Sequence, residues 1–139
     1  MLMAVQFTWS GHCRQMAAAL DGLAGTLQSG YHVDAKDLRA ASASAKWVWD
    51  AGPLPAPAHA ALFVAAREAF DGAIAGCSNK FPKEASIVER EAKRMARELR
   101  WMAIETHQHA PRQELPKAVA QDIHRLVSRF ARNAGARAA

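Results

Sequence analysis

The stretch that decides the fold is Lys83–His109, KEASIVEREAKRMARELRWMAIETHQH. Its apolar residues recur at alternating steps of four and three, a spacing that keeps them on one side of a helix. They are Val88, Ala92, Met95, Leu99 and Met102. The sequence therefore predicts one long amphipathic helix here, with its apolar side buried.

A glutamate also recurs in this stretch every seven residues, beside the apolar side: Glu84, Glu91, Glu98 and Glu105. In heptad terms the apolar residues take positions a and d and the glutamates take position g, from which they often pair with Lys or Arg across a helix interface. The pattern lasts about three repeats, which is short for a free-standing coiled coil. We therefore expect packing within a helical bundle, with a dimer seam as the alternative.

The opposite side of the same helix is basic. Its cations are Arg90, Lys93, Arg94, Arg97 and Arg100. Trp101 and Ile104 also fall on this side, although the apolar stripe does not require them there. Because Trp and Arg contribute most of the binding energy in many interfaces, we expect a docking surface for an acidic partner. The alternative is that this helix packs on two sides, so that Trp101 and Ile104 belong to the core.

A second basic row lies in the segment 116–132, which has the apolar spacing of a final helix. Arg125, Arg129 and Arg132 follow one another there at steps of four and three. Arginines at this spacing can neutralise phosphates along a nucleic-acid backbone. We therefore expect the two C-terminal helices, near 83–109 and 116–132, to present a basic surface.

Three further helices are predicted upstream, over about 10–28, 34–51 and 58–77, with Ser10 as the first N-cap and Gly30 as the end of the first helix. The proline-rich segment Gly52–Pro57 is a stiff crossover between helices two and three. Residues 1–9 form a short arm, and the tail 133–139 should fray. With 139 residues and no alternating strand pattern, we expect a single all-α domain, a bundle of four to five helices.

The third helix has few charged residues, so we expect it to be the most buried. Helices three, four and five should then form most of the core.

The net charge of +5 is unevenly spread. Residues 1–79 hold five Lys/Arg and six Asp/Glu, whereas residues 80–139 hold thirteen and seven. This asymmetry favours an acidic partner for the C-terminal half. No apolar run approaches a membrane span, and the N-terminus lacks a basic signal region, so we expect a cytoplasmic protein. The Ala- and Arg-rich composition fits a bacterial, phage or plasmid origin.

Catalytic and metal-binding motifs are absent from the sequence, so we expect no enzyme, no cofactor and no metal site. His107 and His109 diverge by about 200° on a helix, which separates them as metal ligands. Cys13 and Cys77 lack metal-type spacing. We expect His59 and His124 to be partly buried or surface residues rather than catalytic bases.

The sequence therefore predicts a non-enzymatic binding protein whose acidic partner is a nucleic acid or a nucleoprotein complex. The residues expected to contact it are Arg90, Lys93, Arg94, Arg97, Arg100, Trp101, Ile104, Arg125, Arg129 and Arg132. The connection between the last two helices is too long for a helix-turn-helix motif, which argues against sequence-specific DNA binding. The alternative is a protein-interaction module, such as an adaptor, a subunit or an inhibitor, anchored by Trp101 and including self-association into a homo-oligomer.

Overall fold

The computed structural model describes residues 8–75, 84–105 and 113–133, and these ranges contain five α-helices and no strand. The helices are α1 (Trp9–Gln28), α2 (Ala35–Ala51), α3 (Pro57–Ala75), α4 (Ala85–Glu105) and α5 (Lys117–Phe130), followed by a 3₁₀ turn at Ala131–Asn133. The prediction of a single all-α bundle is confirmed. The N-terminal arm before Thr8, the tail beyond Asn133, Cys77 and the pair His107 and His109 lie outside the described residues.

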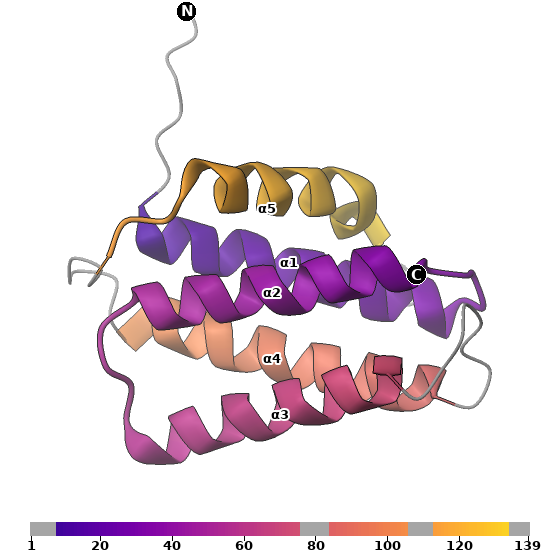
Figure 1. The fold of residues 1–139 in the computed structure, drawn as a ribbon, viewed down its shortest axis with the longest axis horizontal. Coiled ribbons are helices and arrows are strands. Elements are labelled where there is room, and N and C mark those ends of the chain that lie inside the picture. The colour runs from indigo at the N-terminus through magenta and orange to yellow at the C-terminus, as the bar shows by residue number, and fades with distance from the viewer. Residues whose placement is uncertain (1–7, 76–83, 106–112, 134–139) are drawn as a thin grey trace, which may run out of the picture.

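Helix α1 lies at the centre of the bundle and packs most extensively against α4 (Figure 1). Helix α1 packs against α2, α4 and α5, while α3 packs against α4 and α2. Seen as layers, α5 lies on one side of the α1–α2 pair, and α3 and α4 lie on the other. The proline-rich crossover therefore carries the chain from the middle layer to the outer α3.

The ends of α1 are set by local chemistry. Thr8, rather than Ser10, is the N-cap: its Oγ accepts a hydrogen bond from the backbone N–H of Gly11 at 3.1 Å. The helix ends before Gly30, whose φ of +87° lies in the left-handed region that glycine tolerates, as predicted. The indole N–H of Trp9 donates to the carbonyl of Val48 at 2.7 Å, which ties the start of α1 to the end of α2.

The prediction that the third helix is the most buried was wrong. Helix α1 has twelve buried residues, whereas α3 has five. Helix α3 lies at the edge of the bundle, where it packs against α4 and, less extensively, against α2, so its low charge did not lead to burial. Leu62 and Val64 of α3 are consequently exposed.

The apolar side of α4 is the part of the core that the sequence predicted best. Val88, Ala92, Met95, Leu99 and Met102 are all fully buried. Because α4 packs against α1 and α3, the heptad pattern reflects packing within the bundle, not a free dimer seam. Burial of each of the larger side chains contributes about 1.5–3 kcal/mol before conformational entropy is subtracted.

Helix α5 packs closely against α1 at Gly22. A Cβ atom added to Gly22 would lie 1.9 Å from the carbonyl oxygen of Phe130, so only a residue without a side chain fits there. In the part of the chain that the structure describes, no helix combines the length and the apolar character that crossing a bilayer requires.

Candidate interaction surface

The outward side of α4 carries the first predicted basic row. Arg90, Lys93, Arg94, Arg97 and Arg100 are all exposed to solvent. Arg97 lies at the middle of this row and makes no ion pair with another described residue. We call these five residues the α4 basic row.

A buried carboxylate lies beneath two members of the α4 basic row. The Glu91 side chain is only 3% exposed, and its oxygens accept from Arg90 Nε at 3.0 Å and from Arg94 Nη1 at 3.4 Å. A carboxylate at this depth needs such partners, because an unpaired buried charge is costly. Two guanidinium groups share one carboxylate, so this part of the row keeps a positive charge.

Two other members of the α4 basic row, Lys93 and Arg100, are partly neutralised. Arg100 Nη1 forms an ion pair with Asp21 of α1 at 2.5 Å, and Lys93 Nζ forms one with Glu89, one helical turn earlier, at 3.3 Å. Both cations remain about half exposed, where such pairs contribute little to stability. The unneutralised positive charge is therefore concentrated around Arg94 and Arg97.

Trp101 and Ile104 differ in their surroundings. The Trp101 ring is half-buried and stacks on the imidazole of His59 from α3, with ring centroids 3.6 Å apart and planes inclined by 11°. Ile104 is 63% exposed. Trp101 is therefore packed against the core on one side, with its remaining surface towards solvent, whereas Ile104 is not a core residue.

His59 is the functional candidate that sequence reasoning missed. Its Nδ1 lies 2.5 Å from Oε1 of Glu98, whose side chain is 7% exposed, so the imidazole is held between a buried carboxylate and the Trp101 ring. The heptad pattern suggested a Lys or Arg partner for this glutamate. Nothing in the sequence indicates that a histidine near the start of α3 would meet the end of α4, since the pairing spans 39 residues.

The second predicted row, on α5, has a structural role. Arg125 Nη1 lies 3.1 Å from one oxygen of Asp37 and Arg129 Nη1 lies 2.6 Å from the other, and the Asp37 side chain is 6% exposed. The two arginines therefore hold α5 against α2. Arg132, in the 3₁₀ turn, is exposed.

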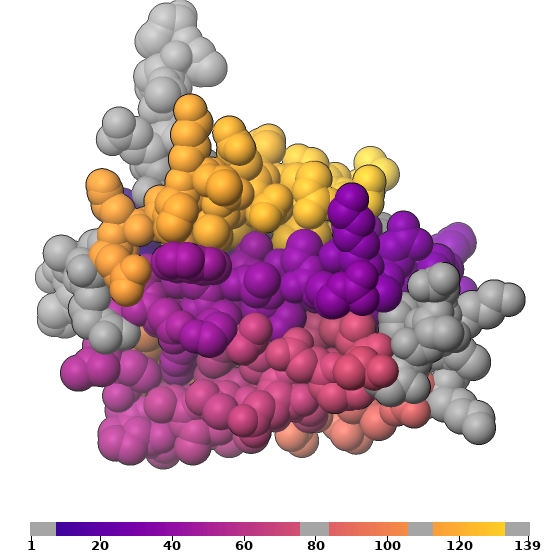
Figure 2. All heavy atoms as spheres, in the orientation of Figure 1, coloured from indigo at the N-terminus to yellow at the C-terminus, as the bar shows by residue number. Residues whose placement is uncertain are grey.

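The two rows do not form one continuous surface. Helix α5 lies across the α1–α2 layer from α4 (Figure 1). In the space-filling view α2 and α3 form the front, α5 the upper edge, and α4 appears only below and behind α3 (Figure 2). The candidate surface is therefore the outward side of α4 and what borders it.

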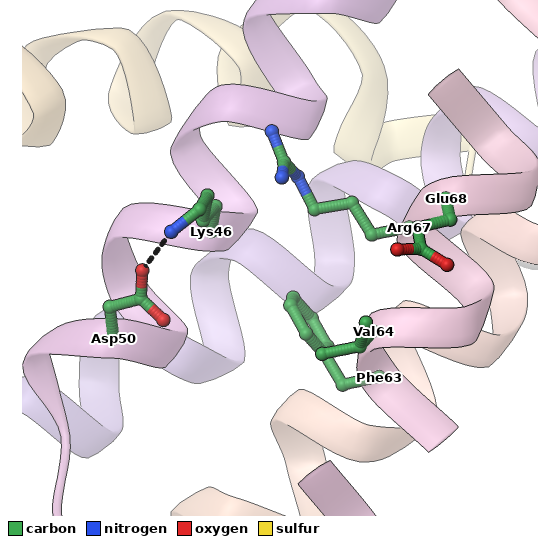
Figure 3. A pocket seen from close by; sticks show the side chains of 6 residues that line it. All are labelled: Lys46, Asp50, Phe63, Val64, Arg67 and Glu68. Carbon is green, nitrogen blue, oxygen red and sulfur yellow. Dashed lines mark hydrogen bonds and ion pairs between the residues drawn. The ribbon is translucent and has the colours of Figure 1, made fainter. Parts of the chain in front are cut away.

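A separate hollow lies between α2 and α3 (Figure 3). It has a volume of about 260 Å³ and is lined by Lys46, Asp50, Phe63, Val64, Arg67 and Glu68. Lys46 forms an ion pair with Asp50, and Arg67 Nε donates to the carbonyl of Ser42. Because its cations and carboxylates balance, this hollow does not select an acidic partner.

The buried titratable groups of α1 are poorly suited to nucleophilic chemistry. Burial raises the pKa of the Cys13 thiol far above its ordinary value, so the reactive thiolate is scarce. Burial lowers the pKa of His12. Within residues 8–75, 84–105 and 113–133, no three His, Cys, Asp or Glu side chains are grouped to hold a metal ion.

Comparison with known proteins returned no matching family model, no matching curated protein and no matching solved structure. The surface is therefore interpreted from its own chemistry.

Proposed function

We propose that this protein is a non-enzymatic binding module that receives an acidic partner on the outward side of α4. The observation that carries the proposal is Arg97, an exposed cation without an ion pair among the described residues, at the centre of the α4 basic row. Beside it, Arg94 is held over the buried Glu91. An acidic group that approaches here meets positive charge that the fold has left uncompensated.

The surroundings of Arg97 favour a protein partner over a nucleic acid. Ile104 is exposed and Trp101 is partly exposed next to the cations, a mixture of apolar and basic side chains that is typical of protein interfaces. A phosphate backbone is bound by many cations in a row. Here Arg125 and Arg129 face Asp37, on the far side of the α1–α2 layer, and cannot extend the row.

The test measures binding of a fluorescein-labelled acidic peptide containing both glutamate and leucine, next to single-stranded RNA and duplex DNA, over a series of salt concentrations. We expect the peptide to bind, and Arg97→Glu to weaken this binding on the order of tenfold by placing like charges together. Arg39→Glu, at another exposed arginine on α2, is the matched control and should leave binding unchanged.

Two results would overturn the proposal. If neither the peptide nor a nucleic acid binds at low salt, the outward side of α4 is not a docking surface. If RNA or DNA binds more tightly than the peptide, and Arg97→Glu weakens that binding, the acidic partner is a nucleic acid.

A further inference from the structure

We infer that the partner presents an acidic amphipathic helix, and that this helix lies along the seam between α3 and α4. The inference rests on the proposed function and adds the shape and the position of what binds. It depends on three observations: an uncharged side of α3, the aromatic ring of Trp101 at the seam, and the α4 basic row.

The side of α3 that faces α2 is fixed by its contacts. Phe63 stacks on Trp49 of α2 with ring centroids 4.3 Å apart, and Arg67 donates to Ser42 of the same helix. Another side of α3, away from α2, carries residues at steps of three and four: Ala58, Leu62, Ala65, Ala69 and Gly72. None of them is charged, four are exposed, and Leu62 is 54% exposed. We call this side the uncharged flank.

The side of α4 that faces α3 is fixed in the same way. Glu98 and Trp101 both contact His59, in the first turn of α3. The two helices run in opposite directions, so Leu62, about one turn after His59, lies beside the turn of α4 that precedes Trp101. Arg97 lies one turn before Trp101, and Arg94 lies two turns before it. The seam therefore places Leu62 and Trp101 next to two cations.

The dimensions of the seam suit a helix. Helices α3 and α4 have 19 and 21 residues, and at about 1.5 Å per residue the seam between them extends for roughly 30 Å. Alanines and Gly72 along the uncharged flank leave room for another helix to approach; a Cβ at Gly72 would meet nothing within 4 Å. Binding of an amphipathic helix with apolar anchors one turn apart is a common mode of recognition.

The positive charge at the seam determines that the partner must be negatively charged. Glu91 and Glu98 are buried and paired, so these two carboxylates do not compete with an incoming acid, whereas the exposed Glu105 lies one turn beyond Trp101, at the end of α4. The uncharged flank adds no carboxylate of its own. A helix with leucines towards Leu62 and Trp101 and glutamates towards Arg94 and Arg97 is therefore complementary to this surface.

The experiment compares three labelled peptides of about 20 residues by fluorescence anisotropy. The first places leucines on one side of a helix and glutamates on the other. The second has the same composition in an order that spreads both around the helix. The third replaces the glutamates of the first with lysines. We expect the first to bind at least tenfold more tightly than either of the others, and to gain helical circular dichroism on binding.

Two pairs of variants locate the contact. Leu62→Glu should weaken binding of the first peptide on the order of tenfold, because it removes an apolar anchor and repels glutamate. Val64→Glu, two residues away on the side of α3 that lines the α2–α3 hollow, is the matched control and should have little effect. Arg97→Glu and Arg39→Glu form the second pair. All four positions are exposed, so the variants should fold.

The outcomes separate this inference from the proposed function. If the first two peptides bind equally and Arg97→Glu weakens both, the proposed function stands and the amphipathic helix is wrong. Equal effects of Leu62→Glu and Val64→Glu would place the peptide elsewhere than the seam and overturn the inference. Binding of the lysine peptide as tightly as the first would overturn both proposals, and absence of binding by all three would do the same.

Discussion

Helices α4 and α5 have similar sequence patterns, but their arginines have different surroundings in the fold. Each is amphipathic, and each carries arginines at helical spacing beside its apolar side. In α5, Arg125 and Arg129 converge on the buried Asp37 and hold the helix to α2. In α4, Arg90 and Arg94 lie over Glu91 of their own helix and stay exposed.

The difference lies in where the buried carboxylate is. Asp37 belongs to α2, so the arginines that neutralise it become part of an interface between helices. Glu91 belongs to α4 itself, and its arginines are adjacent in the same helix and can do no more than cover it. The arginines of α4 that cover Glu91 therefore stay exposed, whereas those of α5 that pair with Asp37 join two helices.

The largest expected effect is a loss of stability where α5 packs against Gly22 of α1. In Gly22→Ala the new Cβ would collide with the Phe130 carbonyl, and backbone cannot move aside as a flexible side chain can. We expect destabilisation of about 3 kcal/mol, measured by urea unfolding, despite the higher helix propensity of alanine. Gly72→Ala, where the Cβ meets open space, is the matched control and should stabilise by up to about 1 kcal/mol. Equal stability of the two variants would show that α5 does not pack on Gly22.

The next largest effect is expected at Asp37, the buried carboxylate with which the α5 arginines pair. Asp37→Asn removes the charge that Arg125 and Arg129 share, and we expect a loss of about 2–3 kcal/mol in the free energy of unfolding. The control is Asp122→Asn, at a half-exposed carboxylate that lies 3.8 Å from Arg125, with an expected change below about 0.5 kcal/mol. If both variants unfold alike, Asp37 does not anchor α5.

A smaller effect compares one arginine from each row. Arg129→Ala should cost about 1 kcal/mol, since it removes one of the two hydrogen bonds to Asp37. Arg97→Ala should change the free energy of unfolding by less than about 0.5 kcal/mol, because Arg97 has no ion pair among the described residues to lose. Thermal and urea unfolding of both variants would measure these losses. A larger loss of stability in Arg97→Ala than in Arg129→Ala would mean that the α4 basic row also stabilises the fold.

The smallest effect concerns α1, to which both helices attach. Burial lowers the pKa of His12 from its ordinary 6.5, so below that pH the unfolded chain binds more protons than the folded one. Stability should therefore fall as the pH is lowered from 7 to 5. In His12→Gln this fall should be smaller, as seen in urea unfolding at several pH values. An unchanged pH profile would show that the imidazole is as easily protonated in the fold as in the unfolded chain.

Local periodicity predicted the helices well, because it depends on residues within a few turns. It placed all five helices and identified the buried side of α4 from Val88 to Met102. It also predicted the end of α1 at Gly30. These features follow from backbone geometry and from steps of three and four, which the sequence displays directly.

Contacts between distant segments were not predictable in this way. The role of Arg125 depends on Asp37, 88 residues away, and the pose of Trp101 depends on His59. A charged residue on a helix has the same sequence signature whether it meets solvent or a buried acid. The edge position of α3 was missed for the same reason, since low charge predicts an apolar surface but not what covers it.

The stack of Trp101 on His59 has a consequence for the rate at which a partner would leave. Because the indole already stacks on His59, which Glu98 holds in place, its rotational freedom is lost on folding rather than at the moment of association. Immobilising a side chain at an interface costs about 0.5–1.5 kcal/mol, and a preorganised anchor avoids that cost. A partner that contacts the indole should therefore dissociate more slowly than it would from the same tryptophan on a mobile side chain.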